Sequence, residues 1–314
     1  MNPELIFAAD ADSFGSGRRS LALQCRAGQL VRLRAGIYID VEVWRQLRAW
    51  EKERVRIQAA SQQVPGQRVL VQQSAAVIWG LPVIDSPPEV LLLASPSSHG
   101  RRRGGLHWTE RKLLEPLDVV EGMSLTSRAQ TALDMAAYLA FEHSVPAMDS
   151  VLRPDLVHGR PATNKDELEK LARNLPDMAK QTRARRVIDF ADPRSESPGE
   201  SYSRAVLHRH GFPVPELQYE FLTSMGHFRT DFYWKDQRVV GEFDGAVKYG
   251  ANGSVLPPSW DTLMREKRRE DAIRATGVAF VRWSWRDIRM PAQHPESLVH
   301  RLIQAGLSPT RRQR

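Results

Sequence analysis

The chain is poor in cysteine: Cys25 is the only one among 314 residues, so no disulfide can form within it. No Cys/His group has the spacing of a zinc site. The first residues lack the basic segment and apolar run of a signal peptide. No apolar stretch approaches the ~18 to 20 residues of a membrane span. We therefore expect a reducing, cytoplasmic setting and no membrane partner.

The usual motifs of several enzyme classes are also missing. We find no G-x-x-x-x-G-K-S/T run, no dinucleotide-binding fingerprint after a strand, and no G-x-S-x-G elbow. Hydrophobic residues make up 41% of the chain and charged residues 26%, which is an ordinary globular composition. A chain of 314 residues is long enough for about two domains.

Positive charge is abundant. The net charge is +8 and the pI is near 9.9, with arginine-rich runs at residues 101–103, 183–186 and 265–269. Such a surface attracts polyanions, of which nucleic acid is the commonest in a cytoplasm. The alternative is a solvated surface that keeps the protein soluble. We expect a nucleic-acid partner, with DNA favoured over RNA.

The N-terminal part predicts a winged-helix-like unit followed by a mixed α/β module. A short helix and a β-hairpin are expected within residues 16–40, and Arg32 and Arg34 alternate with apolar residues on the hairpin. One hairpin face would then be cationic, either to contact nucleic acid or in a purely structural role. Helices at 42–63, 74–80 and 127–142, with buried strands at 69–71 and 90–93, complete the module.

Three segments of this part carry a family resemblance: residues 28–38, 74–82 and 127–134. Over about residues 5–155 the chain resembles the N-terminal part of AbiEi-like antitoxins, the DNA-binding partners of type IV toxin–antitoxin systems. The resemblance implies DNA contact and a cognate toxin or defence partner. We expect a nucleic-acid-binding module over residues 1–160 and a helical linker region over 161–195.

Three acidic residues in the C-terminal third form a pattern with its own chemistry. Asp231 lies inside an aromatic-rich strand at 228–234, and Glu242 and Asp244 lie two apart on the next strand, so they share a face. Carboxylates on adjacent strands suit Mg²⁺ or Mn²⁺, which can activate water and neutralise charge on a phosphate. Lys248 is the nearest lysine that could orient the water. Alternatively, the acids pair with arginines of the helix expected at 263–275.

Two further groups have two interpretations each. Glu200 follows Ser197 with the spacing of a capping box, so its carboxylate either caps a helix or assists catalysis. The helix at 263–275 presents Arg265, Arg268 and Arg269, which either contact phosphates or form a solvated face.

The second resemblance covers about residues 196–306. It is carried by Glu200, Asp231 and the segments 218–220, 242–245, 271–274 and 281–287. These resemble the endonuclease-like domain related to very-short-patch-repair endonucleases. The resemblance implies a restriction-endonuclease-like core of the PD-(D/E)XK kind, with a central mixed sheet flanked by helices. At the end of the chain we expect a flexible tail at 307–314. The resemblance also implies that Asp231 and Glu242 bind the metal while Glu200 assists.

One position departs from that family pattern. Asp244 stands where the E-x-K motif has its lysine, which leaves Lys248 to supply the positive charge. The sequence therefore predicts a Mg²⁺- or Mn²⁺-dependent endonuclease with Glu200, Asp231, Glu242, Asp244 and Lys248 at its catalytic site. The alternative is a DNA-binding regulator or antitoxin whose nuclease core is degenerate.

Overall fold

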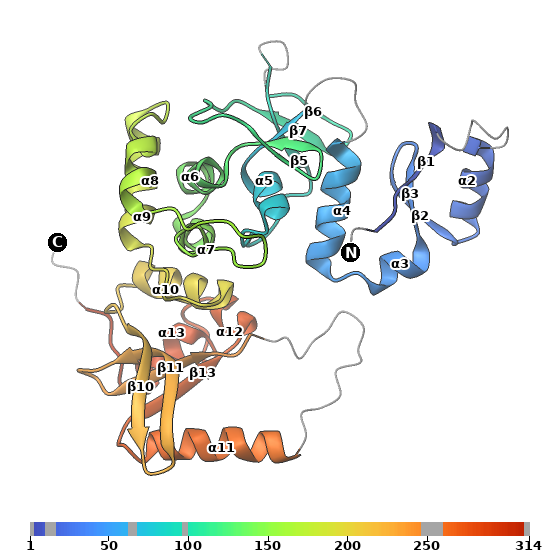
Figure 1. Ribbon diagram of the computed structural model, residues 1–314. Helices are drawn as coiled ribbons and strands as arrows, with labels where there is room; N and C mark the ends of the chain where they lie inside the picture. The colour runs from blue at the N-terminus through green and yellow to red at the C-terminus, as the bar shows by residue number, and fades with distance from the viewer. Residues whose placement is uncertain (1–2, 10–16, 62–67, 96–99, 246–259, 311–314) are drawn as a thin grey trace.

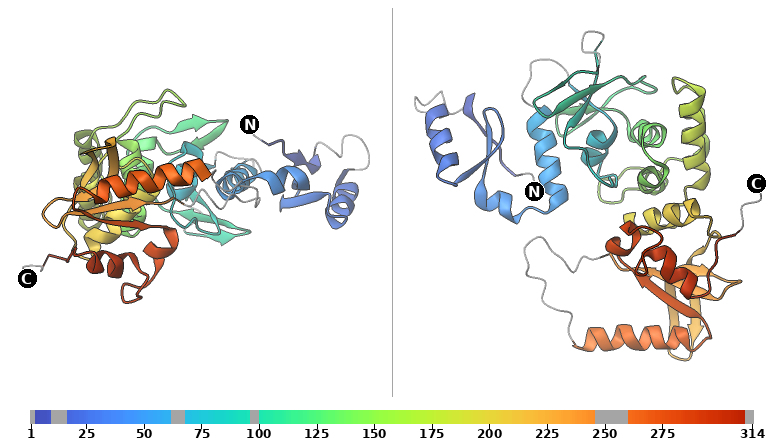
Figure 2. Two further views of the ribbon diagram at one scale, coloured as in Figure 1. Left: turned by 90° about the horizontal axis from the view of Figure 1, so that it is seen from below. Right: turned by 180° about the vertical axis from the view of Figure 1, so that it is seen from behind.

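The structure is a computed structural model that describes residues 3–9, 17–61, 68–95, 100–245 and 260–310 (Figure 1). The described residues form twelve helices and three sheets, which confirms the predicted mixed α/β class. Three units follow one another along the chain, and Figure 2 shows them from two further sides. Within the described ranges, no helix combines the length and apolar character needed to cross a membrane.

The first unit is a helix followed by a hairpin, as predicted. It comprises β1 (Ile6–Phe7), α2 (Gly17–Arg26), β2 (Leu30–Arg34) and β3 (Ile37–Asp40), in an antiparallel sheet of order β1-β3-β2. Gly28, at φ 75°, supplies the left-handed residue after α2 that other residue types rarely adopt. Leu21 of α2 is buried together with Leu30 and Tyr38 of the hairpin in a small core.

Two helices connect this unit to the next, where the sequence predicted one. They are α3 (Val41–Gln46) and α4 (Ala49–Ser61), and Leu47 between them is extended. The Glu51 carboxylate accepts a hydrogen bond from Arg48 N at 2.7 Å, just before α4 begins. This side-chain hydrogen bond lies where a second helix, α4, begins, and hydrophobic periodicity does not reveal that position.

The second unit is built on a six-stranded mixed sheet of order β6-β7-β5-β4-β9-β8. Its strands are β4 (Val69–Leu70), β5 (Val90–Leu93), β6 (Arg102–Arg103), β7 (Leu106–Thr109), β8 (Asp118–Val120) and β9 (Met123–Leu125). Its helices are α5 (Gln72–Trp79), α6 (Arg128–Tyr138), α7 (Phe141–Val151), α8 (Lys165–Ala172) and α9 (Met178–Phe190). The helices of residues 161–195 are packed against α6 and α7, and they bury Leu168 and Ile188 in the same core.

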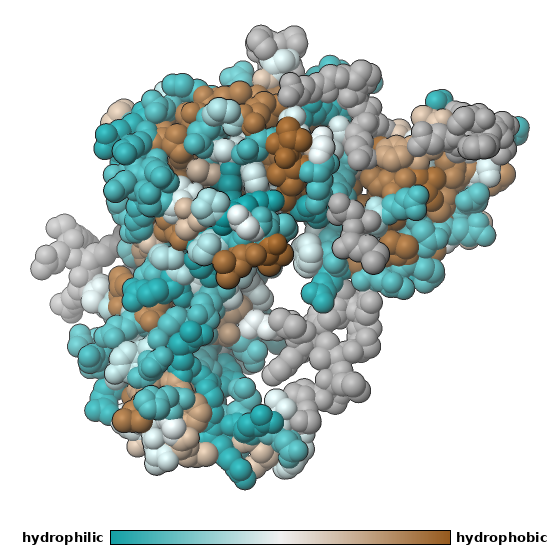
Figure 3. Space-filling view, in the orientation of Figure 1, coloured by the Kyte–Doolittle hydropathy of each residue, from teal (hydrophilic) through white to brown (hydrophobic). Residues whose placement is uncertain are grey.

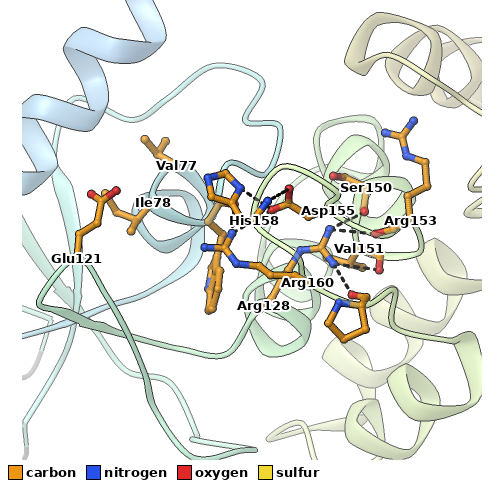
Figure 4. Close-up of polar contacts among 12 residues, drawn as sticks. Val77, Ile78, Glu121, Arg128, Ser150, Val151, Arg153, Asp155, His158 and Arg160 are labelled. Carbon is orange, nitrogen blue, oxygen red and sulfur yellow. Dashed lines mark hydrogen bonds and ion pairs between the residues drawn. The ribbon is translucent and has the colours of Figure 1, made fainter. Parts of the chain in front are cut away.

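Two arginines hold the loop between α7 and α8 against this core (Figure 4). Arg128 donates to the carbonyl oxygens of Ser150 at 2.8 Å and Val151 at 3.3 Å, which end α7 without partners in the helix. Arg160 donates to Trp79 O at 3.2 Å and lies over the Trp79 ring. His158 and Arg160 both bind the Asp155 carboxylate, so this group of charges braces the loop.

The third unit is a four-stranded mixed sheet between two helical layers. The strands β10 (Glu216–Thr223), β11 (Gly226–Trp234) and β12 (Val239–Phe243) are antiparallel, and β13 (Ala279–Trp283) runs parallel to β12. One face is covered by α10 (Pro198–Arg209), α12 (Trp285–Arg289) and α13 (Leu298–Gln304), and the other by α11 (Trp260–Arg274). This is the central mixed sheet with flanking helices that the sequence predicted. Figure 3 shows a mostly hydrophilic surface on this unit in that view.

A buried ion pair joins the second and third units. Arg204 of α10 donates to the Asp149 carboxylate of α7 at 2.9 Å, and the two side chains are 3% and 0% exposed. The Arg209–Glu142 pair lies on the same interface. In Figure 1, α10 lies between α7 and the third sheet, so the two units share a packed and charged interface.

Candidate active site

Carboxylates from three elements, Glu200 of α10, Asp231 of β11 and Glu242 of β12, lie close enough for their charges to interact. Phe232 pairs with Gly241, and the same register continued by one residue sets Asp231 of β11 opposite Glu242 of β12. Phe232 belongs to the cluster under α10 and α12, whereas Tyr233 and Val240 pack beneath α11. Glu242 faces the α11 side, where Arg269 binds it.

Glu200 enters the site from the first turn of α10. Ser197 Oγ accepts from Glu200 N at 3.2 Å, while Glu200 Oε2 accepts from Glu196 N at 2.9 Å and from Gln218 Nε2 at 3.0 Å. Only one half of the predicted capping box is therefore formed, the hydrogen bond from Glu200 N to Ser197. The Glu200 carboxylate does not return to the Ser197 amide but accepts from the amide of Glu196 and the side chain of Gln218. Only 7% of Glu200 is exposed.

Gln218 belongs to a segment that carries the second resemblance, but the sequence predicted no role for it at this site. The β10–β11 register, continued between its printed pairs, sets Gln218 opposite Asp231, and its φ is +55°. A left-handed residue other than glycine costs roughly 1–2 kcal/mol and is concentrated at functional sites. Glutamine has no preference for positive φ, so residue type gave no signal of this geometry.

Electrostatics single out Asp231. Burial and then the negative charge of Glu200 raise its pKa to about 7, and the charge of Glu242 adds to this. The hydrogen bond from Phe243 N to Asp231 Oδ2, at 2.8 Å, and the charge of Arg269 act in the opposite direction without cancelling the rise. The hydrogen-bond donors and positive charges around the Asp231 carboxylate therefore do not fully balance its negative charge.

Glu242, by contrast, is well compensated. Arg269 of α11 approaches Glu242 Oε1 at 2.6 Å and Arg282 of β13 approaches Oε2 at 3.2 Å, with the Glu242 side chain 12% exposed. The pairing of Glu242 with a helix arginine, which the sequence left open as an alternative, is present. The sequence did not predict the contact between Arg282 and Glu242, because it depends on the parallel register that aligns these two residues.

The other two predicted catalytic residues lie past the end of β12. Asp244 N donates to Trp283 O at 2.8 Å, so the backbone continues along β13 for one more residue. The structure places Asp244 directly after the strand that bears Glu242. Lys248 lies outside the described residues.

Two glycines near the site leave room for aromatic rings to pack directly against the backbone. A Cβ on Gly241 would lie 2.5 Å from Trp283 Cη2, and one on Gly199 would lie 1.9 Å from Phe243 Cε1. Trp283 is 1% exposed and belongs to the core. Trp285 begins α12, and its ring packs against Phe243.

The predicted nucleic-acid-binding arginines lie in two places. Arg32 is exposed on β2, whereas Arg34 donates to Gly104 O at 2.7 Å and so ties the first unit to the second. Burial lowers the pKa of Arg34. On α11, Arg265 and Arg268 are exposed and Arg269 points to Glu242.

The donor set at the site is compatible with Mg²⁺ held by few protein ligands. Within the described residues no group of three or more His, Cys, Asp or Glu side chains is arranged to hold a metal. Mg²⁺ commonly takes only one or two carboxylates and fills its remaining positions with water and substrate phosphates. Asp231 and Glu242 supply hard oxygen donors in that number, so the pair fits the ion while the site is not a closed cage.

Comparison with known proteins gives relatives but no function. No family model matches the chain. An uncharacterised protein from each of two Mycobacterium tuberculosis strains is 27% identical over 267 residues, covering 84% of this chain and 89% of the relative.

Proposed function

We propose that the protein is a metal-dependent endonuclease that hydrolyses phosphodiester bonds, in DNA rather than RNA. The observation that carries this proposal is the position of Asp231, a partly buried acid opposite Glu242 and near Glu200 with its pKa raised to about 7. An acid with under-compensated negative charge beside a second carboxylate on the neighbouring strand is what a site for a divalent cation requires.

Each residue has a role in this proposal. Asp231 and Glu242 would hold Mg²⁺ or Mn²⁺, which when bound lowers the pKa of water and neutralises charge on the phosphate. Glu200 positions Gln218 opposite Asp231 through its 3.0 Å hydrogen bond. Arg269 provides a positive charge beside Glu242, in place of the lysine that the family motif has at the position of Asp244. We retain Lys248 as a second candidate for that charge and Asp244 as a supporting acid.

The wider setting belongs to the same proposal. The resemblances to AbiEi-like antitoxins and to very-short-patch-repair endonucleases support a cytoplasmic role in defence or in a toxin–antitoxin system. The net charge of +8 supports a polyanionic substrate, with Arg32, Arg265 and Arg268 as exposed phosphate contacts. Arg34 would contribute indirectly, by holding the hairpin against the second unit.

A cleavage assay tests the proposal. The purified chain is incubated with plasmid, single-stranded DNA and RNA in Mg²⁺, Mn²⁺ or EDTA. We expect metal-dependent cleavage that Asp231→Ala and Glu242→Ala abolish and that the exposed-acid control Asp236→Ala retains. Cleavage that survives Asp231→Ala would show that the activity arises elsewhere or from a contaminant.

The pairing of Glu242 supports a second candidate function. Both of its oxygens are bound by arginines, as expected of a core that binds DNA without cutting it. In that case the protein is a DNA-binding regulator or antitoxin. Salt-sensitive binding to its own promoter without Mn²⁺ binding in calorimetry would favour this function. Mn²⁺ binding that is lost in Glu242→Ala would favour the nuclease.

A further inference from the structure

The second unit contains a cavity of about 790 Å³ beside β7, on elements unrelated to the acidic site. Pockets for small ligands usually measure roughly 300–1,000 Å³, so a nucleotide fits within this volume. The side chains relevant to binding are partly buried or exposed and come from β7 and the segment after it, from α6 and from α9. They are His107, Trp108, Arg111, Lys112, Tyr138 and Lys180.

The charge around this cavity is mostly positive. Arg111, Lys112 and Lys180 line it beside the acid Glu110, and Asp177 forms an ion pair with Lys180. Two of the cations lie over the Tyr138 ring in cation–π contacts. The Arg111 guanidinium carbon is 3.6 Å and Lys180 Nζ 5.2 Å from the ring centroid. Burial, followed by the positive charge of Arg102, lowers the pKa of His107, so the neutral imidazole can serve as a hydrogen-bonding group. The cavity is suited to an anion.

Arg111 is held in place by an arrangement that costs backbone strain. Its Nη2 donates to Gln72 Oε1 at 2.7 Å, and Gln72 adopts a φ of +48° while 97% of its surface is buried. The Gln72 side chain also donates to Asp134 O at 3.4 Å. Left-handed residues other than glycine are uncommon and are concentrated where a side chain must be placed for function.

The charge of Arg111 is only partly balanced from within the protein. Asp134 lies behind it and is 1% exposed, yet Asp134 Oδ2 and Arg111 Nε are both buried without a hydrogen-bond partner. Burial raises the pKa of Asp134 to about 7 in spite of the Arg111 charge. A cation held next to a cavity with a weak internal counterion favours an anion from outside.

We propose that this cavity binds a nucleotide, with its phosphate at Arg111, Lys112 and Lys180 and its base against the Trp108 indole. Arginine supplies a planar set of donors for phosphate oxygens, lysine adds point charge, and an indole face stacks on any base. The phosphate can belong to a free nucleotide or to the 5′ end of a nucleic acid. Because the site uses the second unit alone, the proposal does not depend on nuclease activity.

Calorimetry on the full chain in EDTA tests the proposal. The probes are inorganic phosphate, AMP, and one DNA oligonucleotide with and without a 5′-phosphate. We expect AMP to bind more tightly than inorganic phosphate if the source is a free nucleotide, or the 5′-phosphorylated oligonucleotide to bind more tightly than its unphosphorylated form if the source is a nucleic-acid end. Either result supports the site when Lys112→Gln lowers the affinity about tenfold, the loss of one charge-assisted contact.

The matched control is Lys170→Gln, which removes the same charge from an exposed position on α8. Equal losses from Lys112→Gln and Lys170→Gln would overturn the proposal, because net charge alone would then explain binding. Inorganic phosphate binding as tightly as AMP and as the phosphorylated end would overturn it too, as would no binding of any probe. Trp108→Leu, which keeps an apolar side chain at the cavity wall, should weaken AMP binding and leave inorganic phosphate unchanged.

Discussion

The raised pKa of Asp231 makes a prediction about folding stability that does not require catalysis. The pKa is 3.8 in its ordinary state and about 7 in the folded protein, a rise of about three units. At about 1.4 kcal/mol per unit, the ionised carboxylate costs the folded state up to ~4 kcal/mol. A folded protein has only about 5–15 kcal/mol of stability, so this cost is large.

The pH dependence has a definite sign. Because the pKa of Asp231 is raised on folding, the folded state holds this proton more tightly than the unfolded chain. The contribution of Asp231 is most favourable below about pH 4 and is lost as the pH rises towards 7. Asparagine has nearly the same shape, can still accept the Phe243 N–H hydrogen bond, and carries no charge. We therefore expect Asp231→Asn to stabilise the protein in EDTA at pH 8, by about 2–4 kcal/mol, and by less at pH 5.

Urea unfolding of both proteins at pH 5 and pH 8, followed by circular dichroism, measures the effect. The control is Asp236→Asn, which removes an exposed carboxylate from the β11–β12 turn and should show little difference between the two pH values. Added Mg²⁺ should stabilise the unsubstituted protein and leave Asp231→Asn unchanged. Equal stability changes at both pH values, or destabilisation at pH 8, would refute the account of charge at this site.

Three further substitutions test, in turn, the packing of the third sheet, the buried ion pair between the second and third units, and an exposed ion pair. Gly241→Ala should cost about 1–3 kcal/mol and lower the thermal midpoint, since its Cβ would lie 2.5 Å from Trp283 Cη2. Asp149→Ala should cost about 3–5 kcal/mol in urea unfolding, because it leaves Arg204 buried at 3% exposure without its counterion. Arg229→Ala removes only an exposed ion pair, so its unfolding free energy should change by less than about 1 kcal/mol.

The sequence predicted those parts of the third unit that depend on local patterns. Alternating apolar residues and the turn after Trp234 identified β11 and β12, and the cap at Ser197 with its following proline identified α10. These signals lie within a few residues of the structure they specify. The mixed α/β class followed from them and is confirmed.

What the sequence did not reveal depends on register and on distant contacts. The partner of Glu242 on β13 is 40 residues away, and only the parallel pairing aligns Arg282 with it. The break between α3 and α4 depends on one side-chain cap, and the helix expected at 127–142 ends at Tyr138 before a second helix begins. The positive φ of Gln218 belongs to the assembled sheet. Such features arise from tertiary geometry, which residue preferences describe poorly.

The contrast between Glu242 and Asp231 bears on the choice between the two candidate functions. If the core only bound DNA, both acids could be balanced by the same means, and an arginine pair already balances Glu242. Asp231 lies on the neighbouring strand and remains under-compensated, at a cost of up to ~4 kcal/mol that asparagine would avoid. The uncompensated charge of Asp231, next to a Gln218 with positive φ, supports the proposal that Asp231 binds the cation while Arg269 and Arg282 hold Glu242 beside it.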